Sequence, residues 1–195
     1  QGYDFLREAI LKNDFLPRGI HLDIDEVFIN DGAKSDTGNF QELLHWDNFI
    51  GVTDPIYPVY IDSNVMIGRA GVQENGRWSN VIYMPCNAEN NFVPQIPDQR
   101  VDVIYLCYPN NPTGASATPE FYDKAIAFAK ENNALLVIDA AYAPLNFKGK
   151  PFSIFSRPNG KEVAVELHSM SKGFNMTGWR LGWVCGNADA VKAFA

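Results

Sequence analysis

The chain of 195 residues is 46% hydrophobic and 13% aromatic, a composition that suits one globular domain with a sizeable core. Its 23 acidic and 16 basic residues give a net charge of −7 without any block of like charge, which disfavours DNA or RNA as a partner. No stretch approaches the roughly 18 consecutive apolar residues of a membrane span, and the N-terminal QGYDFLREAI lacks a secretory-signal pattern, so we expect a cytosolic protein without a membrane partner.

Short apolar runs alternate with longer amphipathic segments, as in a parallel sheet with helical crossovers. In chain order, the predicted strands cover residues 26–30, 48–53, 81–85, 101–107, 134–139, 163–167 and 180–186. The clearest helix follows Thr118, whose hydroxyl can cap it, and Pro119 suits its first turn. This helix would serve as the crossover that makes the strands before and after it parallel neighbours.

The predicted elements are separated by clusters of Asn, Pro and Gly, which we interpret as loops at residues 31–39, 85–91 and 108–114. No repeat, low-complexity segment or linker divides the chain, so residues 1–195 are expected to form one domain. Both ends are unusual, because Gln1 opens directly on an amphipathic segment and the last helix-like segment stops at Ala195 without a cap. We therefore expect a fragment from the middle of a larger protein.

The cysteines and histidines give no indication of a metal site or a disulfide. The three cysteines lie far apart within apolar runs, which is typical of buried thiols in a reducing compartment, and they are Cys86, Cys107 and Cys185. The histidines lack metal-ligand spacing and are expected to cap, pack or line a pocket, and they are His21, His45 and His168. No metal is therefore expected.

Parallel sheets bind ligands beyond the carboxyl ends of their strands, so the residues that follow each predicted strand are the candidates for a site. After residues 26–30, Gly32 allows a tight turn, and backbone N–H groups with Lys34 can hold a phosphate, although a plain surface loop fits equally well. After residues 48–53, Tyr57 lies on a proline-stiffened loop and suits stacking on a flat ring, or simple packing.

Two further strand ends carry polar side chains. After residues 101–107, Asn111 precedes a proline and its amide can donate inward, although turn chemistry alone also explains it. Asp139 closes an apolar strand, where a carboxylate is costly unless it meets a cation or a strong donor. Tyr142 is close enough in sequence to reach the same cavity. Helix capping is the alternative role for Asp139.

The stretch HSMSKGFNMTGWRLGW carries the most specific chemistry. Lys172, which follows Ser169 and Ser171 and lies near apolar residues, is expected to be partly desolvated, which favours the neutral amine that attacks an aldehyde. Arg180, flanked by glycines, offers a bidentate clamp for a phosphate. Together with the Asp, Tyr, Asn and stacking aromatic, this set describes a site for pyridoxal phosphate.

The segments YPNNPTGA, IDAAYAPL and HSMSKGFNMTGWRLG resemble the motifs of class I/II, fold-type I pyridoxal-phosphate aminotransferases. The resemblance covers nearly the whole chain and implies the large domain of such an enzyme. That domain is a three-layer α/β/α structure with a seven-stranded, mostly parallel sheet, whose one antiparallel strand would be residues 180–186. The resemblance also implies a homodimer, and an N-terminal arm and a C-terminal small domain that these residues do not include, so the fragment alone is expected to be inactive.

The resemblance implies a role for each candidate residue. Lys172 would form the internal aldimine and move the proton between the substrate's α carbon and the cofactor, and Asp139 would pair with the pyridine nitrogen. Asn111 and Tyr142 would bond the phenolic oxygen, and Tyr57 would stack on the ring. The phosphate would be held by Ala33, Lys34, Ser169, Ser171 and Arg180.

Within the class, VFINDGAKSD and TDPIYPVYIDSNVMIG are most similar to the LL-diaminopimelate aminotransferases. That similarity implies amino transfer from glutamate to tetrahydrodipicolinate, giving LL-2,6-diaminopimelate for lysine and peptidoglycan synthesis, with small amino and 2-oxo acids as partners. The alternatives are an aminotransferase for aspartate, alanine or aromatic amino acids, a β-lyase of the same fold, or the effector-binding domain of a transcription regulator.

Overall fold

The computed structural model describes residues 2–147, 149 and 151–195, and within these residues the central sheet has seven strands in the order β1-β9-β8-β7-β6-β2-β5. Only β9 pairs with its neighbours in the antiparallel direction. The strands are β1 (Val27–Asn30), β2 (Ile50–Asp54), β5 (Val81–Pro85), β6 (Val103–Cys107), β7 (Leu135–Asp139), β8 (Ala164–Ser169) and β9 (Gly182–Gly186).

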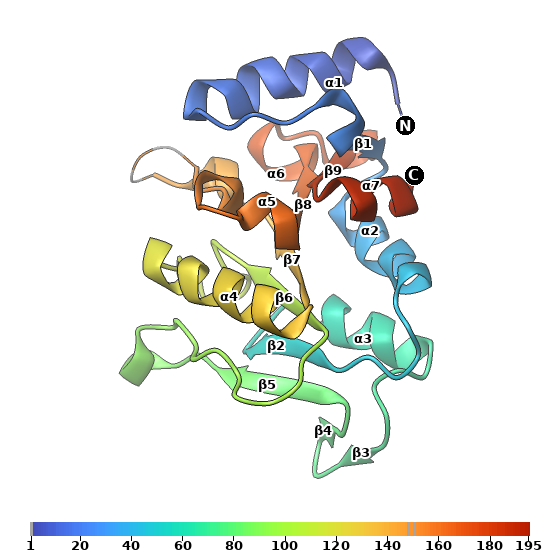
Figure 1. Ribbon diagram of the computed structural model, residues 1–195, viewed down its shortest axis with the longest axis vertical. Coiled ribbons are helices and arrows are strands. Elements are labelled where there is room, and N and C mark those ends of the chain that lie inside the picture. The colour runs from blue at the N-terminus through green and yellow to red at the C-terminus, as the bar shows by residue number, and fades with distance from the viewer. Residues whose placement is uncertain (1, 148, 150) are drawn as a thin grey trace.

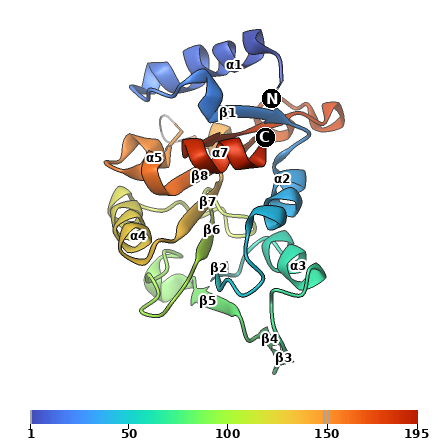
Figure 2. The same ribbon diagram turned by 45° about the vertical axis from the view of Figure 1, so that its right-hand side comes forward.

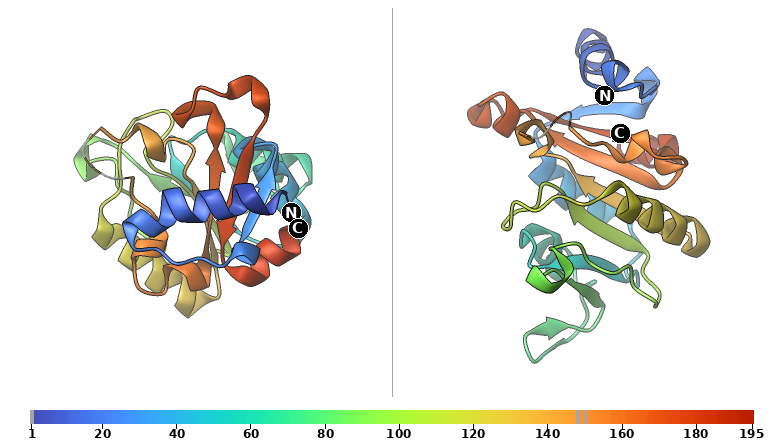
Figure 3. Two further views of the ribbon diagram at one scale, coloured as in Figure 1. Left: turned by 90° about the horizontal axis from the view of Figure 1, so that it is seen from above. Right: turned by 90° about the vertical axis from the view of Figure 1, so that its left-hand side faces the viewer.

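Helices cover both faces of this sheet. Figure 1 and Figure 2 show α4 and α5 on one side and α2 and α3 on the other. Seen from above and from the side in Figure 3, α1 lies across one end of the molecule, far from the small β3–β4 hairpin. The helices are α1 (Asp4–Ile10), α2 (Ala33–Asn39), α3 (Val59–Met66), α4 (Pro119–Asn132), α5 (Gly160–Val163), α6 (Met170–Gly173) and α7 (Ala188–Phe194).

Side-chain alternation along the strands builds a separate core on each face. In β6, Val103, Tyr105 and Cys107 join the core under α2, α3 and α7, whereas Ile104 and Leu106 join the core under α4. A strand that is buried on both sides in this way reads as a continuous apolar run in the sequence. The predicted three-layer α/β/α architecture is confirmed.

All seven predicted strands are present, with boundaries that differ by a few residues. The predicted strand at residues 180–186 begins only at Gly182, because Arg180 adopts a left-handed backbone conformation with φ 50°. Its antiparallel direction is confirmed, as is the parallel pairing of β6 with β7. The helix after Thr118 is confirmed together with its cap, since the Thr118 hydroxyl accepts a hydrogen bond from the Phe121 amide at 3.3 Å.

One predicted loop is wrong. Residues 31–39 were expected to be irregular, yet Ala33–Asn39 form the helix α2. The run of small and polar residues has low helix propensity, but Ala33 and the following Phe40 are buried against the sheet, so tertiary packing outweighs propensity here.

The hairpin of β3 (Gln73–Glu74) and β4 (Arg77–Trp78) was not predicted from the sequence. Its turn is Asn75-Gly76, in which both residues have positive φ, 50° and 79°. An Asn-Gly pair is the strongest short-range hairpin signal, so the sequence did contain the information.

The three cysteines are free and buried, as their positions in apolar strands predict. In the described part of the chain, no helix combines the length and apolar character that crossing a membrane requires.

Candidate functional site

The register of the sheet brings several strand ends to one edge. Cys107, the last residue of β6, pairs with Asp139, the last residue of β7. At the other side of the sheet, Gly182 pairs with both Ser169 of β8 and Asn30 of β1. Because β9 runs antiparallel, its start lies at the same edge as the ends of the parallel strands. The segments that follow or precede these positions therefore converge.

A cavity of about 370 Å³ lies at this edge. All ten residues that the sequence predicts for cofactor binding line it, and they come from six separate segments of the chain. They are Ala33, Lys34, Tyr57, Asn111, Asp139, Tyr142, Ser169, Ser171, Lys172 and Arg180.

One side of the cavity concentrates cationic and hydrogen-bonding groups. Gly32 has φ 125°, and a Cβ atom at that position would lie 3.2 Å from Nη2 of Arg180, so only glycine allows the arginine to approach the backbone this closely. Nη1 of Arg180 donates to the Thr177 carbonyl at 3.0 Å, which leaves Nη2 on the side of Gly32. Lys34 lines the same cavity. The charges favour an anion here.

The serines before Lys172 are ordered by a local hydrogen bond. Oγ of Ser169 accepts from the amide N–H of Ser171 at 3.2 Å and caps the short helix α6, which carries Lys172. This cap fixes the direction in which the chain leaves β8. Both serines and the lysine consequently line the same cavity.

A second group of polar side chains lies on the side of the cavity near Lys172. The amide Nδ2 of Asn111 donates to the Tyr142 hydroxyl at 3.4 Å, and Nζ of Lys172 lies 5.6 Å from the centre of the Tyr142 ring. Burial raises the pKa of Tyr142, which keeps its hydroxyl protonated at neutral pH. Asn111 and Tyr142, which follow different strands, therefore act as one hydrogen-bonded pair.

Asp139 is 8% exposed and meets two donors. Its Oδ1 accepts from the Ala141 amide at 2.9 Å, and its Oδ2 accepts a short hydrogen bond from the Tyr60 hydroxyl. Burial is the largest influence on this carboxyl and raises its pKa, while the hydrogen bond from Tyr60 acts in the opposite direction. No helix begins at Asp139, since the next short helical turn is preceded by Tyr142, so the alternative capping role is wrong.

One expectation for the Lys172 segment is not met. Lys172 is exposed rather than partly desolvated, because its neighbours Gly173 and Phe174 are also exposed and leave that side of the cavity open. His168 does not line this cavity. It stacks on Trp183 with a centroid distance of 4.7 Å and bonds Glu166 at 2.9 Å, because its side chain points to the opposite face of β8.

The sequence did not single out Tyr60, which bonds Asp139, or Cys107, which lines the cavity. Burial and the nearby Asp139 charge raise the pKa of the Cys107 thiol to about 12. Tyr60 lies three residues after Tyr57, a spacing that places both on one side of a helical turn. That spacing was the available signal.

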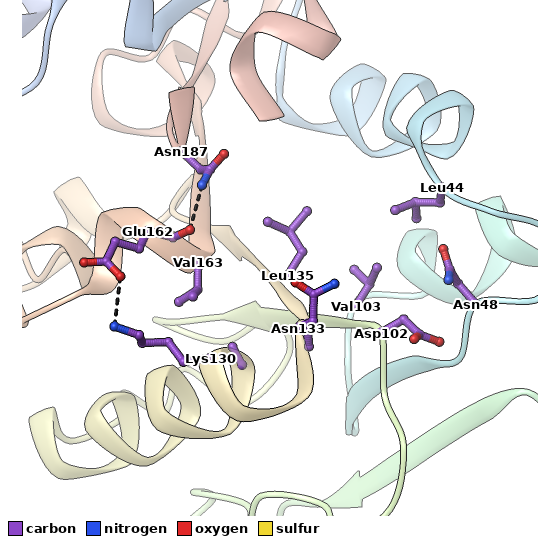
Figure 4. Close-up of a pocket in the computed structure, with 12 residues that line it drawn as sticks. Leu44, Asn48, Asp102, Val103, Lys130, Asn133, Leu135, Glu162, Val163 and Asn187 are labelled. Atoms are coloured by element: carbon purple, nitrogen blue, oxygen red, sulfur yellow. Dashed lines mark hydrogen bonds and ion pairs between the residues drawn. The ribbon is translucent and has the colours of Figure 1, made fainter. Parts of the chain in front are cut away.

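A second pocket, of about 520 Å³, lies at the opposite edge, where β6 and β7 begin. Figure 4 shows its apolar floor, which includes Leu135, and the ion pair at its rim between Lys130 and Glu162, 2.9 Å apart. Asn187 donates to the Glu162 carbonyl at 2.6 Å. These polar groups satisfy one another, and none of the predicted cofactor-binding residues lines this pocket.

Several curated relatives of this chain are LL-diaminopimelate aminotransferases. The LL-diaminopimelate aminotransferase of Bacteroides fragilis is 58% identical over 186 residues, and that of Methanosphaera stadtmanae is 53% identical over 185 residues; each alignment covers 94% of this chain and 45% of the relative. The solved L,L-diaminopimelate aminotransferase of Chlamydomonas reinhardtii matches with a TM-score of 0.88 and 37% identity, covering 100% of this chain and 51% of that one.

The fold extends to further aminotransferases. An aspartate aminotransferase from Thermus thermophilus, a double mutant, matches with a TM-score of 0.83 and 27% identity, covering 99% of this chain and 49% of that one. The chain thus spans about half the length of the proteins it matches. The sequence profile described as aminotransferase class I and II matches residues 4–195, nearly the whole chain. This chain belongs to the class I and II aminotransferase family.

Proposed function

We propose that these residues are the cofactor-binding large domain of a pyridoxal-phosphate-dependent aminotransferase. The observation that carries the proposal is the set of side chains in one cavity: a lysine amine, a buried carboxylate, a tyrosine-asparagine pair and a serine-arginine group. The donor set fits the cofactor at each of its functional groups. The buried Asp139 suits a protonated ring nitrogen, and the narrow space between Gly32 and Arg180 suits a phosphate oxygen.

Each residue then has a specific task. Pyridoxal phosphate supplies an aldehyde for covalent attachment of an amine and a ring that accepts electrons. Lys172 provides the attaching amine, and its Nζ moves a proton at the substrate's α carbon. Asp139 holds the proton on the ring nitrogen, while Asn111 and Tyr142 donate to the ring oxygen. The phosphate is held by Ala33, Lys34, Ser169, Ser171 and Arg180.

Tyr57 completes the ring site from one face. It lines the cavity and packs edge-to-face on Tyr60, with centroids 6.1 Å apart and an interplanar angle of 83°. This contact restrains the Tyr57 ring, so that stacking on a flat ligand costs little additional ordering.

For the substrate, we propose that the protein transfers the amino group of glutamate to tetrahydrodipicolinate, giving LL-2,6-diaminopimelate. The support is that curated relatives 51–58% identical to this chain, among them the Bacteroides fragilis and Methanosphaera stadtmanae proteins, are LL-diaminopimelate aminotransferases. We further propose that the protein acts in the cytoplasm as a homodimer.

The groups that bind the substrate carboxylates are proposed to lie in parts of the protein outside these residues, because the chain covers 45% of its curated relatives. Aromatic side chains beside the cavity support this proposal. Trp179 is 75% exposed and Phe174 is 55% exposed. Large exposed aromatics next to a site are typical of surfaces that another segment or subunit covers.

The test uses the full-length protein and the complete reaction in the reverse direction. LL-2,6-diaminopimelate and 2-oxoglutarate should yield glutamate, and Lys172→Ala should abolish the activity. Aspartate, alanine and phenylalanine serve as competing donors. Faster glutamate production from one of these would contradict the substrate assignment. Release of pyruvate, ammonia and a thiol from a β-substituted amino acid such as cystathionine, without amino transfer, would indicate a β-lyase instead.

A further inference from the structure

Tyr60 is one of the most deeply buried side chains, 1% exposed, and its hydroxyl donates to Oδ2 of Asp139. Burial and the Asp139 charge raise the pKa of Tyr60 well above its ordinary value, so the phenol remains a donor over the whole physiological range. Asp139 Oδ1 takes its hydrogen bond from the Ala141 amide. Both oxygens of the Asp139 carboxylate therefore accept a hydrogen bond from the protein itself.

The Tyr60 ring is fixed by its own surroundings. It stacks on Tyr105 with centroids 5.2 Å apart and an interplanar angle of 22°. Asn64 donates to the Tyr60 carbonyl at 2.7 Å, and the Tyr105 hydroxyl accepts from Gln41 at 3.1 Å. Gln41 in turn accepts from Arg69, which is 2% exposed. Ring stacking on Tyr105 and the hydrogen bond from Asn64 to its backbone thus hold Tyr60 in place, beside a buried polar network that does not contact its hydroxyl.

Other charged and titratable groups reach Asp139 from each neighbouring element. Electrostatic interactions with His168 of β8 and Lys172 of α6 act to lower the pKa of Asp139. Cys107 of β6 is uncharged at neutral pH because burial raises its pKa. The Asp139 charge in turn contributes to raising the pKa of Asp36 of α2. Tyr60 is the only neutral side chain among the described residues for which a hydrogen bond to this carboxylate is seen.

We propose that Tyr60 is a positioning residue for the reaction, which keeps Asp139 ionised and aimed so that a bound pyridine ring retains its proton. This inference rests on the proposed function. Without the phenol, Asp139 would be a stronger base and would take the proton from the ring nitrogen. The ring would then be a weaker electron acceptor, although Tyr60 itself does not line the cofactor cavity.

The test measures the ring nitrogen directly, by ¹⁵N NMR of the full-length protein reconstituted with ¹⁵N-labelled pyridoxal phosphate. In Tyr60→Phe the ¹⁵N shift should move toward that of unprotonated pyridine, and the Kd for the cofactor should rise about tenfold. Tyr105→Phe is the matched control: it removes an equally buried hydroxyl from the adjacent network, one that bonds Gln41, not Asp139. Its ¹⁵N shift should equal that of the wild type.

Equal ¹⁵N shifts in wild type and folded Tyr60→Phe would overturn the inference, and so would an equal displacement in Tyr105→Phe. If Tyr60→Phe does not fold, 4-fluorophenylalanine at position 60 fills the hydroxyl's volume without donating, and the same displacement is expected from it. A wild-type protein that binds no cofactor would contradict the proposed function itself. A wild-type protein that binds it, with an unchanged Tyr60→Phe, would contradict this inference alone.

Discussion

Asp36 is an unusual residue beside the candidate site. It is 0% exposed, and neither of its carboxylate oxygens has a hydrogen-bond partner among the described residues. Burial, with a smaller effect from the Asp31 charge, raises its pKa to about 8. The Asn30 amide lies close enough to lower this pKa, yet it does not form a well-directed hydrogen bond. At neutral pH the folded protein therefore holds a proton on Asp36.

This proton makes stability depend on pH. Between about pH 4 and pH 8 the folded state binds a proton at Asp36 that the unfolded state has released, so stability falls as pH rises through this range. The slope from one proton is at most about 1.4 kcal/mol per pH unit. Asp36→Asn removes the ionisable group and should remove this contribution.

We predict that the stability of Asp36→Asn relative to wild type increases with pH. The difference between the two free energies of unfolding, variant minus wild type, should be about 1–3 kcal/mol larger at pH 8.5 than at pH 5. Urea denaturation at the two pH values measures it. Asp98→Asn changes an exposed carboxylate and serves as the control, with no expected difference. The same pH dependence in Asp36→Asn and in wild type would show that Asp36 is ionised in the folded protein.

At the residue scale, the sequence predicted the side chains whose chemistry is distinctive. Lys172 and Arg180 stand out by spacing, and Asp139 stands out because a carboxylate ending an apolar strand needs a partner. The spacing from Tyr57 pointed to Tyr60 only weakly, and its contact with Asp139 could not be predicted, because it joins residues 79 apart and depends on how α3 packs on β7. The prediction that Lys172 is partly desolvated was wrong. It assumed that neighbouring residues such as Phe174 shield the amine from water, but those neighbours are themselves exposed.

At the scale of elements, the site depends on close contact between β9 and its two neighbours. A Cβ atom on Gly182 would lie too close to the His168 carbonyl oxygen, 2.9 Å from Cα of Gly32 and 3.0 Å from Oδ1 of Asn30. A glycine is needed here so that three strands can approach at the edge that carries the anion-binding groups.

Gly182→Ala should therefore lower the free energy of unfolding by about 1–3 kcal/mol and also weaken pyridoxal-phosphate binding, because β9 must move and carry Arg180 with it. Gly178→Ala is the matched control in the same segment, since nothing lies within 4 Å of the added Cβ. Thermal unfolding and a cofactor titration measure both effects. Equal stability and affinity for the two variants would contradict the role of this close approach.

The helices and strands were largely predictable from the sequence, and the predictions that failed did so for physical reasons. Period and composition identified all seven strands, because strands buried on both faces are apolar throughout. The helix α4 was identified by its Thr118 cap and its Pro119. The helix α2 was missed because it forms by packing of Ala33 and Phe40 rather than by propensity.

At the scale of the whole molecule, the sheet brings the side chains that we propose to bind the cofactor to one edge, while Lys172 and Trp179 remain exposed there. The chain spans about half the length of its relatives. A site whose walls come from one half of a protein is expected to bind its cofactor more weakly than the whole, because part of the ligand surface stays in water.

The antiparallel strand illustrates what sequence resemblance adds at this scale. Periodicity alone did not give the direction of residues 180–186, and resemblance to the aminotransferases did. The strand order, in which β9 lies between β1 and β8, follows from tertiary contacts that no local pattern encodes. This order is what brings Arg180 next to Gly32.

The most direct test of the proposed function is a visible-absorption titration of the purified protein with pyridoxal phosphate. Borohydride reduction and peptide mapping would follow, with Lys172→Ala as the control. We predict a cofactor absorption band that the variant lacks, and a reduced adduct on Lys172, first in the full-length protein and more weakly in residues 1–195. A folded full-length protein without that band, or an adduct on another lysine, would contradict the account.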